Sequence, residues 1–182
     1  MAWTAPMTAT LNGVISSANF NTYIRDNLNQ TLPGLSSAGN PDTWFISTGA
    51  NQVTARTLGY GYSHNSFTDN STGGAYVDLG MPSTTITTGT AVFLQYSFWG
   101  QCPVNNGAIS VSVAVSGAST LAPGVVGASN YDGVVNGVWT ERTIGSFVSL
   151  TAGSNTFKMW ANSNGHNGSI YARPNLIVIP LN

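Results

Sequence analysis

Charged side chains are the scarcest feature of this 182-residue chain. Lys, Arg, Asp and Glu together make up 6% of it, and the formal net charge is −1. Ordinary soluble domains carry about 25% charged residues. The five basic residues are scattered with no two adjacent, whereas nucleic acids and anionic membranes are bound by clustered Lys and Arg. No apolar run has the length of a membrane span. The sequence therefore predicts neither a nucleic-acid partner nor a membrane partner.

Nucleophiles and metal ligands are almost as scarce. The single cysteine, Cys102, has no partner for an internal disulfide and is expected to be a small buried apolar residue. His64 and His166 each lie in a segment of Gly, Asn and Ser, with no second His, Cys or acid at the spacing of a metal site. Both are expected to be exposed loop histidines. The sequence thus predicts no catalytic residue, no metal and no cofactor.

The few carboxylates support the same conclusion. Asp69 and Asp132 lie in loop-like segments that each supply one acid, whereas calcium needs several oxygens that converge on one point. Glu141 is the only glutamate and is expected to be a solvated strand residue. A carboxylate pair for glycoside hydrolysis remains an alternative, resting on Glu141 and Asp132. The favoured interpretation is that the protein is not an enzyme.

Most of the chain follows the period of β-strands. Apolar residues make up 42% of it, which is enough for a packed core. Residues 109–116 alternate apolar and small polar side chains, so one face is expected to be buried and the other to meet water or another chain. About eight short strands separated by Gly, Asn, Pro and Ser clusters predict an all-β, jelly-roll-like sandwich. The predicted strands are 53–58, 75–79, 91–98, 109–116, 138–147, 156–161, 169–172 and 176–179.

The first part of the chain has a different pattern. Residues 15–28 form the one good helix candidate, with Ser16 as N-cap and Phe20, Ile24 and Leu28 along one narrow apolar face. A helix of about three turns is unstable alone and must pack against something else. We therefore divide the chain into an N-terminal anchor with a short amphipathic helix and linker, residues 1–43, and a β-sandwich head, residues 44–182.

The aromatic residues allow two interpretations. Exposed tryptophans form carbohydrate-stacking surfaces in lectin-like modules, and large aromatics also pack between subunits. Trp160 is expected to face away from Phe157 and Met159, which suggests an interface, and subunit packing is the favoured interpretation. The loop aromatics Tyr60, Tyr62 and Tyr131 are the candidates for contact with a host receptor or glycan. The five tryptophans are Trp3, Trp44, Trp99, Trp139 and Trp160.

Two segments resemble virion proteins of tailed bacteriophages. Trp3-Thr4-Ala5-Pro6, followed by residues 13–28 with the sequence GVISSANFNTYIRDNL, is similar to an N-terminal signature of small phage structural proteins. Residues 150–157 and 173–181 resemble the last strands of trimeric jelly-roll knobs on phage fibres and decoration proteins. The first match covers about the first 30 residues and is the more specific of the two.

The resemblance implies a homotrimer with an N-terminal anchor and a β-rich head. A shaft does not fit in a chain of this length, so the expected role is a capsid decoration protein on the particle exterior, bound to the major capsid protein. The alternative is a minor tail or tail-fibre protein with a receptor- or carbohydrate-binding head. The residues assigned to anchoring and assembly are Trp3, Pro6, Phe20, Tyr23, Ile24, Arg25, Asp26 and Leu28.

Overall fold

A computed structural model describes residues 43–182 except 50–51, 72 and 135. The predicted anchor, with its helix at 15–28 and all eight anchoring residues, lies outside the described residues except for its last residue, Thr43. Contacts divide the chain into two units, residues 1–56 and 57–182. In the first unit, β1 (Thr43–Gly49) pairs with β2 (Gln52–Thr57), which ends one residue beyond the division. The predicted division into an anchor and a head stays a prediction.

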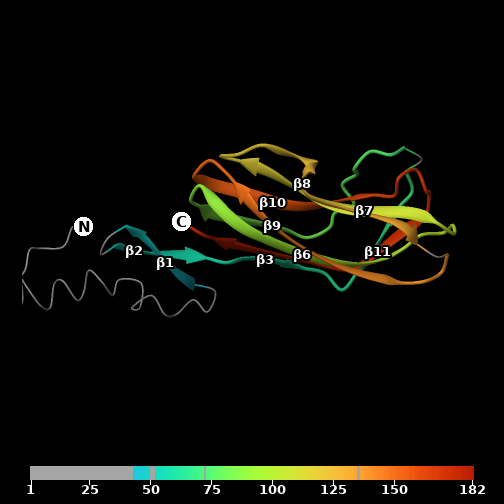
Figure 1. The fold of residues 1–182 in the computed structure, drawn as a ribbon, viewed down its shortest axis with the longest axis horizontal. Coiled ribbons are helices and arrows are strands. Elements are labelled where there is room, and N and C mark those ends of the chain that lie inside the picture. The colour runs from blue at the N-terminus through green and yellow to red at the C-terminus, as the bar shows by residue number, and fades with distance from the viewer. Residues whose placement is uncertain (1–42, 50–51, 72, 135) are drawn as a thin grey trace, which may run out of the picture. The chain divides into compact units, whose positions relative to one another are not determined.

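The second unit is a sandwich of two antiparallel sheets (Figure 1). One sheet has the strand order β5-β10-β7-β8, and the other has the order β3-β11-β6-β9, with β4 also paired to β11. The predicted all-β sandwich is therefore confirmed. Its strands are β3 (Gly59–Tyr62), β4 (Ser66–Asp69), β5 (Ser83–Thr88), β6 (Ala91–Gln101), β7 (Gly107–Gly117), β8 (Leu121–Val134), β9 (Thr140–Ser149), β10 (Gly153–Asn162) and β11 (Ser169–Pro180).

Period-two alternation builds the core between the sheets. On β10, Phe157 and Met159 are fully buried, whereas Trp160 is only partly buried on the opposite face. The predicted orientation of that strand is confirmed. On β6, Leu94 and Phe98 point inward in the same way. Cys102 is buried as expected, and the described residues include no helix that is both long and apolar enough to span a membrane.

Predictions about three parts of the strand pattern were wrong, in whole or in part. Residues 169–172 and 176–179 belong to the single strand β11 and not to two strands. Residues 75–79 do not form a strand and make only an isolated bridge, Val77 to Ala161. On β7, the serine face meets water only near its end, where Ser116 is exposed. Ser112 is fully buried, donates to the Val126 carbonyl at 2.8 Å and accepts from the Gly124 amide at 2.8 Å. Bulges in β8 bring its backbone to that hydroxyl. Both faces of β7 are therefore covered by the chain itself from Gly107 to Val113.

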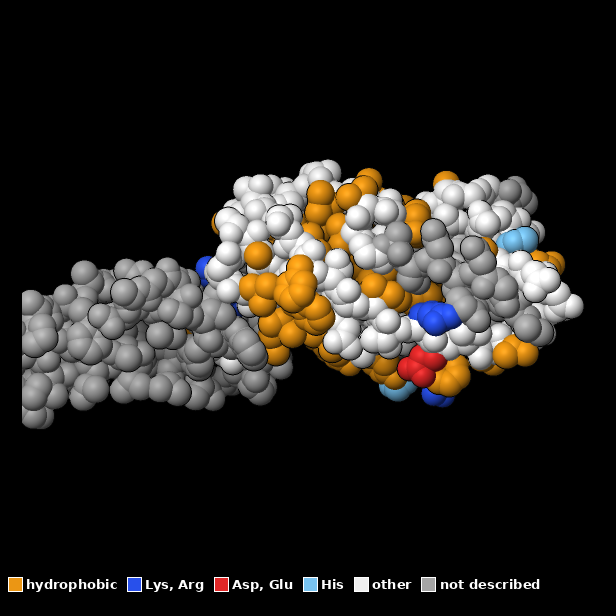
Figure 2. Space-filling view, viewed as in Figure 1, with side chains coloured by type: hydrophobic (Ala, Val, Ile, Leu, Met, Phe, Trp, Pro, Cys, Tyr) orange, Lys and Arg blue, Asp and Glu red, His pale blue; other side chains and the backbone are white. Residues whose placement is uncertain are grey.

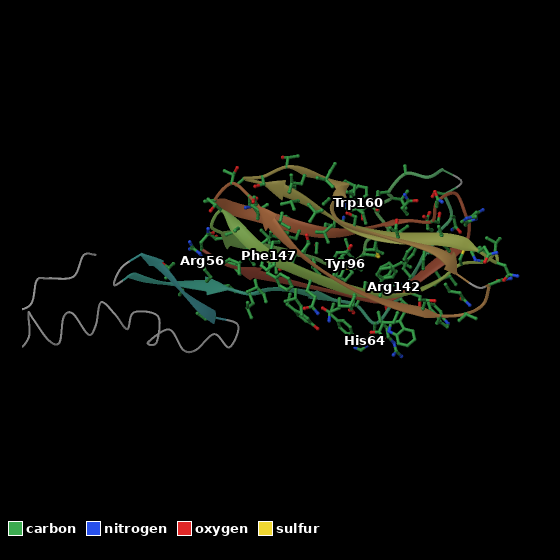
Figure 3. All side chains as sticks on the ribbon, in the orientation of Figure 1. Arg56, His64, Tyr96, Arg142, Phe147 and Trp160 are labelled. Carbon is green, nitrogen blue, oxygen red and sulfur yellow. The ribbon has the colours of Figure 1, made fainter. Side chains whose placement is uncertain are left out.

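Polar side chains also connect the layers. Tyr96 lies between the two sheets (Figure 3), and its hydroxyl meets the carbonyls of Val111, at 2.8 Å, and of Gly127. At the end of the sandwich where β5 and β10 pair, Asn155 is fully buried. Its side chain links β10 to a strand residue, Thr88, and to the loops that follow β7 and β9. These contacts satisfy backbone groups that burial would otherwise leave unpaired.

Candidate functional site

The outward face of the β3-β11-β6-β9 sheet carries the largest exposed side chains of the described residues. At one end, Phe93 of β6 stands opposite Phe147 of β9, with ring centroids 5.1 Å apart. Ile179 of β11 stands on the other side of Phe93, and Ile177 points to the same face. Phe147 is 77% exposed. We call Phe93, Phe147, Ile177 and Ile179 the apolar cluster.

The apolar cluster stands out on the surface. Figure 2 shows hydrophobic side chains gathered at the end of the sandwich where Figure 3 labels Phe147, with few charged side chains on the face in view. Phe147 lies on β9, an edge strand of its sheet, so its ring has no neighbouring strand on its far side. A large aromatic side chain left in water is unfavourable, because burying it is worth about 1.5–3 kcal/mol. The apolar cluster is therefore a candidate contact surface.

Tyrosines occupy the next part of the same face. Tyr60 and Tyr62 on β3 are 59% and 41% exposed, and their rings stack with centroids 6.4 Å apart and planes at 17°. The Tyr62 hydroxyl lies 2.9 Å from Nδ1 of His64, and the two rings meet edge to face at 4.5 Å. The structure thus brings two of the three predicted tyrosines together. Tyr131 lies on β8 in the other sheet, and its side chain is not among those described.

A pocket of about 400 Å³ opens beyond these tyrosines. It lies between the β3–β4 turn, β11, β6 and the segment that leads into β9. Trp99 and Trp139 supply its aromatic walls and are 38% and 41% exposed. Figure 3 shows His64 pointing away from the sandwich interior at this face. The lining residues are His64, Ser66, Trp99, Trp139, Ala172 and Arg173.

The two histidines, Asp69 and Glu141 are either exposed or take part in loop structure. His64 is exposed as expected, whereas His166 is half-buried in the turn before β11, where its amide donates to the Ser163 carbonyl. Asp69 is 1% exposed and accepts from the amides of Ser71 and Ser163, so it holds two loops together. Glu141 is exposed on β9, as predicted. No group of three or more potential ligands for a metal ion occurs within the described ranges.

Two acid groups have shifted pKa values for clear reasons. The hydrogen bond from Lys158 lowers the pKa of Asp78 from its usual range, and the Gly80 amide adds to this effect. Burial raises the pKa of the Tyr171 hydroxyl, and the nearby Asp69 raises it further. Neither group lines the pocket. Both pKa shifts make the stability of the fold depend on pH.

Sequence reasoning missed the part played by three positions. The sequence presents Trp99 and Trp139 only as members of a set of five tryptophans, and Arg173 only within the resemblance to the last strands of jelly-roll knobs. The signal for Trp99 is its even spacing from Phe93, which puts both on one face of a strand. Arg173 has no comparable signal, because its position depends on a register shift in the pairing of β11 with β6.

No protein family matches the sequence, and no curated protein matches it. Among solved structures, the VP2 subviral particle of infectious bursal disease virus is similar at a TM-score of 0.49 and 15% identity, over 75% of this chain and 37% of that one. The CBM22-1 xylan-binding domain of Paenibacillus barcinonensis Xyn10C gives 0.34 and 12%, over 68% and 88% of the two chains. Eiger TNF from S. frugiperda gives 0.40 and 8%, over 70% and 93%. This chain thus spans little more than a third of the VP2 chain, and its fold is assigned from its own strand pairing.

Proposed function

We propose that this protein is a bacteriophage virion structural protein that forms a homotrimer and coats the outside of the capsid. The observation that carries the proposal is the apolar cluster, in which a phenylalanine is 77% exposed on the outer face of a sheet. A second copy or a neighbouring virion protein would cover this cluster in the assembled particle. The role is structural, without catalysis.

The charge of the protein supports assembly. A net charge of −1 leaves little repulsion between copies, and near-zero net charge promotes association. A closed symmetric oligomer turns this tendency into a finite particle, because each copy presents the same surface to its neighbour. The resemblance of residues 150–157 and 173–181 to trimeric knobs makes three the expected number of copies.

Residues 1–35 supply the attachment to the particle in this proposal. Their resemblance to an N-terminal signature of small phage structural proteins covers the assigned residues Trp3, Pro6, Phe20, Tyr23, Ile24, Arg25, Asp26 and Leu28. The partner is the major capsid protein, or a tail protein in the alternative role. Neither nucleic acid nor membrane is a partner, since the few basic residues are scattered.

Sedimentation of single-residue variants tests the assembly surface. The wild-type chain should sediment at three times its 19.0 kDa mass. Phe147→Asp places a charge in the apolar cluster and should give monomers with an unchanged circular dichroism spectrum. Thr87→Asp, at an exposed position on the other sheet, is the matched control and should leave the trimer intact. A wild-type monomer, or a trimer that persists in Phe147→Asp, would contradict this surface.

A truncation tests the anchor separately. Removing residues 1–35 should leave a folded head that no longer decorates particles. The measurement is occupancy of purified particles by the truncated and complete chains, after circular dichroism has shown that both are folded. Attachment of the truncated chain at full occupancy would refute the assigned anchor.

The alternative is a minor tail or tail-fibre protein whose head binds a receptor or carbohydrate. Its support is the exposed and stacked pair Tyr60 and Tyr62. The location of the chain in an imaged particle separates the two roles, since a decoration protein follows the capsid lattice and a tail protein does not.

A further inference from the structure

The pocket beside Trp99 has features that the assembly role does not use. It is separated from the apolar cluster along β6 by the outward residues Gln95 and Ser97. Its walls mix two indole rings with polar and charged groups. Small-molecule sites commonly have this character, with aromatic walls and a few polar groups that fix the orientation of the ligand.

An irregularity in β11 positions the charged group of this pocket. The pairing of β11 with β6 shifts register between Ala172 and Asn175, so Arg173 and Pro174 form a bulge. Arg173 has a φ of 48°, in the left-handed region that side chains rarely adopt. The other described non-glycine residues with positive φ are Asn106 and Asn164, and asparagine tolerates this region far better than arginine does.

The strained backbone of the bulge is held in place by the neighbouring turn. The Arg173 amide donates to the Asn65 carbonyl at 3.3 Å, and the Ser63 amide donates to the Pro174 carbonyl at 3.1 Å. These bonds fix the turn that carries His64 beside the bulge that carries Arg173. Strain of this kind persists where the surrounding structure enforces it, and it clusters at binding sites. Bulges likewise re-aim side chains next to such sites.

The Arg173 guanidinium is available for a ligand. The structure gives this side chain no hydrogen bond or ion pair with any of the described residues. It is nevertheless the only Lys or Arg among the residues that line the pocket. A guanidinium with no such contact is well suited to bind a carboxylate, which it can hold through two parallel hydrogen bonds.

The other residues of the pocket suit the remainder of a sugar ligand. Trp99 pairs with Ala172 of β11 on one side and with Glu141 of β9 on the other. An indole face is a large apolar platform that accepts the C–H face of a pyranose ring. Ser66 and His64 also line the pocket, and their side chains can form hydrogen bonds with hydroxyl groups. One ligand that has an apolar ring face, several hydroxyls and one carboxylate meets all three requirements.

We infer that this pocket binds an acidic sugar residue, stacked on Trp99 with its carboxylate on Arg173 and its hydroxyls toward Ser66 and His64. Trp139 closes the pocket from the segment before β9. The inference gives the alternative carbohydrate-binding role a site and a ligand class. It does not depend on trimer formation or on the anchor, and it is tested on the purified complete chain.

Two probes that differ in one group test the ligand class. Methyl β-D-glucuronide carries a carboxylate where methyl β-D-glucoside carries a hydroxymethyl group, and their rings are otherwise the same. Titration followed by tryptophan fluorescence should give saturable binding of the glucuronide, about tenfold tighter than the glucoside, because a charge-assisted bidentate contact is gained. No saturable binding of either sugar overturns the site. Equal affinity for the two overturns the acidic assignment.

Three variants then place the binding in the pocket. Trp99→Ala should weaken both sugars at least tenfold. Arg173→Asn keeps a residue that tolerates the backbone conformation and should bind the two sugars equally. Trp160→Phe, on the other sheet, is the control and should leave both affinities unchanged. Unaltered glucuronide binding by Arg173→Asn overturns the inference, and this variant suffices if Trp99→Ala does not fold. Sedimentation of the same samples reports trimer formation independently.

Discussion

The buried amide of Asn155 offers the sharpest test of how the sandwich is stabilised. Its Oδ1 accepts from the Ser119 amide at 2.7 Å. Its Nδ2 donates to Oγ1 of Thr88 at 2.8 Å and to the Thr151 carbonyl at 3.0 Å. One side chain therefore joins β5, β10 and the loops that follow β7 and β9. No water can replace it without entering a fully buried position.

Asn155→Ala would remove all of these bonds at once. The buried Ser119 amide and Thr88 hydroxyl would lose their partner, and each buried polar group left unpaired costs about 1–3 kcal/mol. The expected loss in free energy of unfolding is about 3–5 kcal/mol, out of about 5–15 kcal/mol for a domain of ordinary stability. Equilibrium urea unfolding, with the slope held common to the two proteins, measures this loss.

Asn162→Ala is the matched control. Asn162 is only partly buried, donates to the Gly74 carbonyl at 2.8 Å and accepts from the Asn164 amide at 2.6 Å. Water can satisfy these groups after truncation, so the expected loss is below about 1 kcal/mol. A loss below about 1 kcal/mol in Asn155→Ala, or equal losses in the two variants, would refute the reasoning that burial sets the cost.

Two further predictions concern pH. Burial raises the pKa of Tyr171, so above pH of about 10 unfolding releases a proton that the folded protein retains, and stability falls as pH rises. Tyr171→Phe should lessen this fall, measured by urea unfolding from pH 8 to 11. An identical fall in the two proteins would contradict the assignment. The pKa of Asp78 is lowered by Lys158, so that pair stabilises above pH of about 4 and the benefit is lost as pH falls below it. Since the pair is about one third exposed, Lys158→Met should cost less than about 1 kcal/mol at pH 7 and nothing near pH 2, and a constant difference over that range would count against the ion pair.

The strands that the sequence predicted well are those whose burial alternates without interruption. β10 is the clearest case, because Phe157, Met159 and Ala161 all face the core. β5 escaped prediction because Ile86 is its only apolar residue beyond the threonine methyls. The segment 75–79 shows the reverse error: its apolar residues alternate, yet it makes a single bridge beside β10. Alternation of apolar and polar residues therefore predicts which side chains are buried, but it does not predict which backbone segments pair.

The sequence did not predict β8, for a different reason. Its sequence contains Pro123, Gly124 and Gly127, which predict loops in a single sequence. In the folded chain both glycines adopt positive φ at bulges of an edge strand. Proline is accepted at a sheet edge because the missing amide faces no partner strand. The residues of β8 locally favour a loop, but pairing with β7 in the folded chain makes this segment a strand.

The candidate pocket could be foreseen only in part. Trp99 follows from its spacing along β6, but Trp139 and Arg173 arrive beside it through the order of strands in the sheet. The position of Arg173 depends on a register shift against β6. A register shift is a property of two strands together, and one strand's sequence does not encode it.

The bulged edge at β8 limits how copies of this protein can meet. A straight edge strand would let one molecule extend the sheet of the next without end, which is the geometry of fibres. The irregular backbone of β8 interrupts that template on one side of the β5-β10-β7-β8 sheet. A nearly uncharged protein has little repulsion to keep its edges apart, so this protection has to be built into the backbone. In the proposed homotrimer, copies would meet through the sheet face that carries the apolar cluster, and face contacts related by rotation close after a fixed number of subunits.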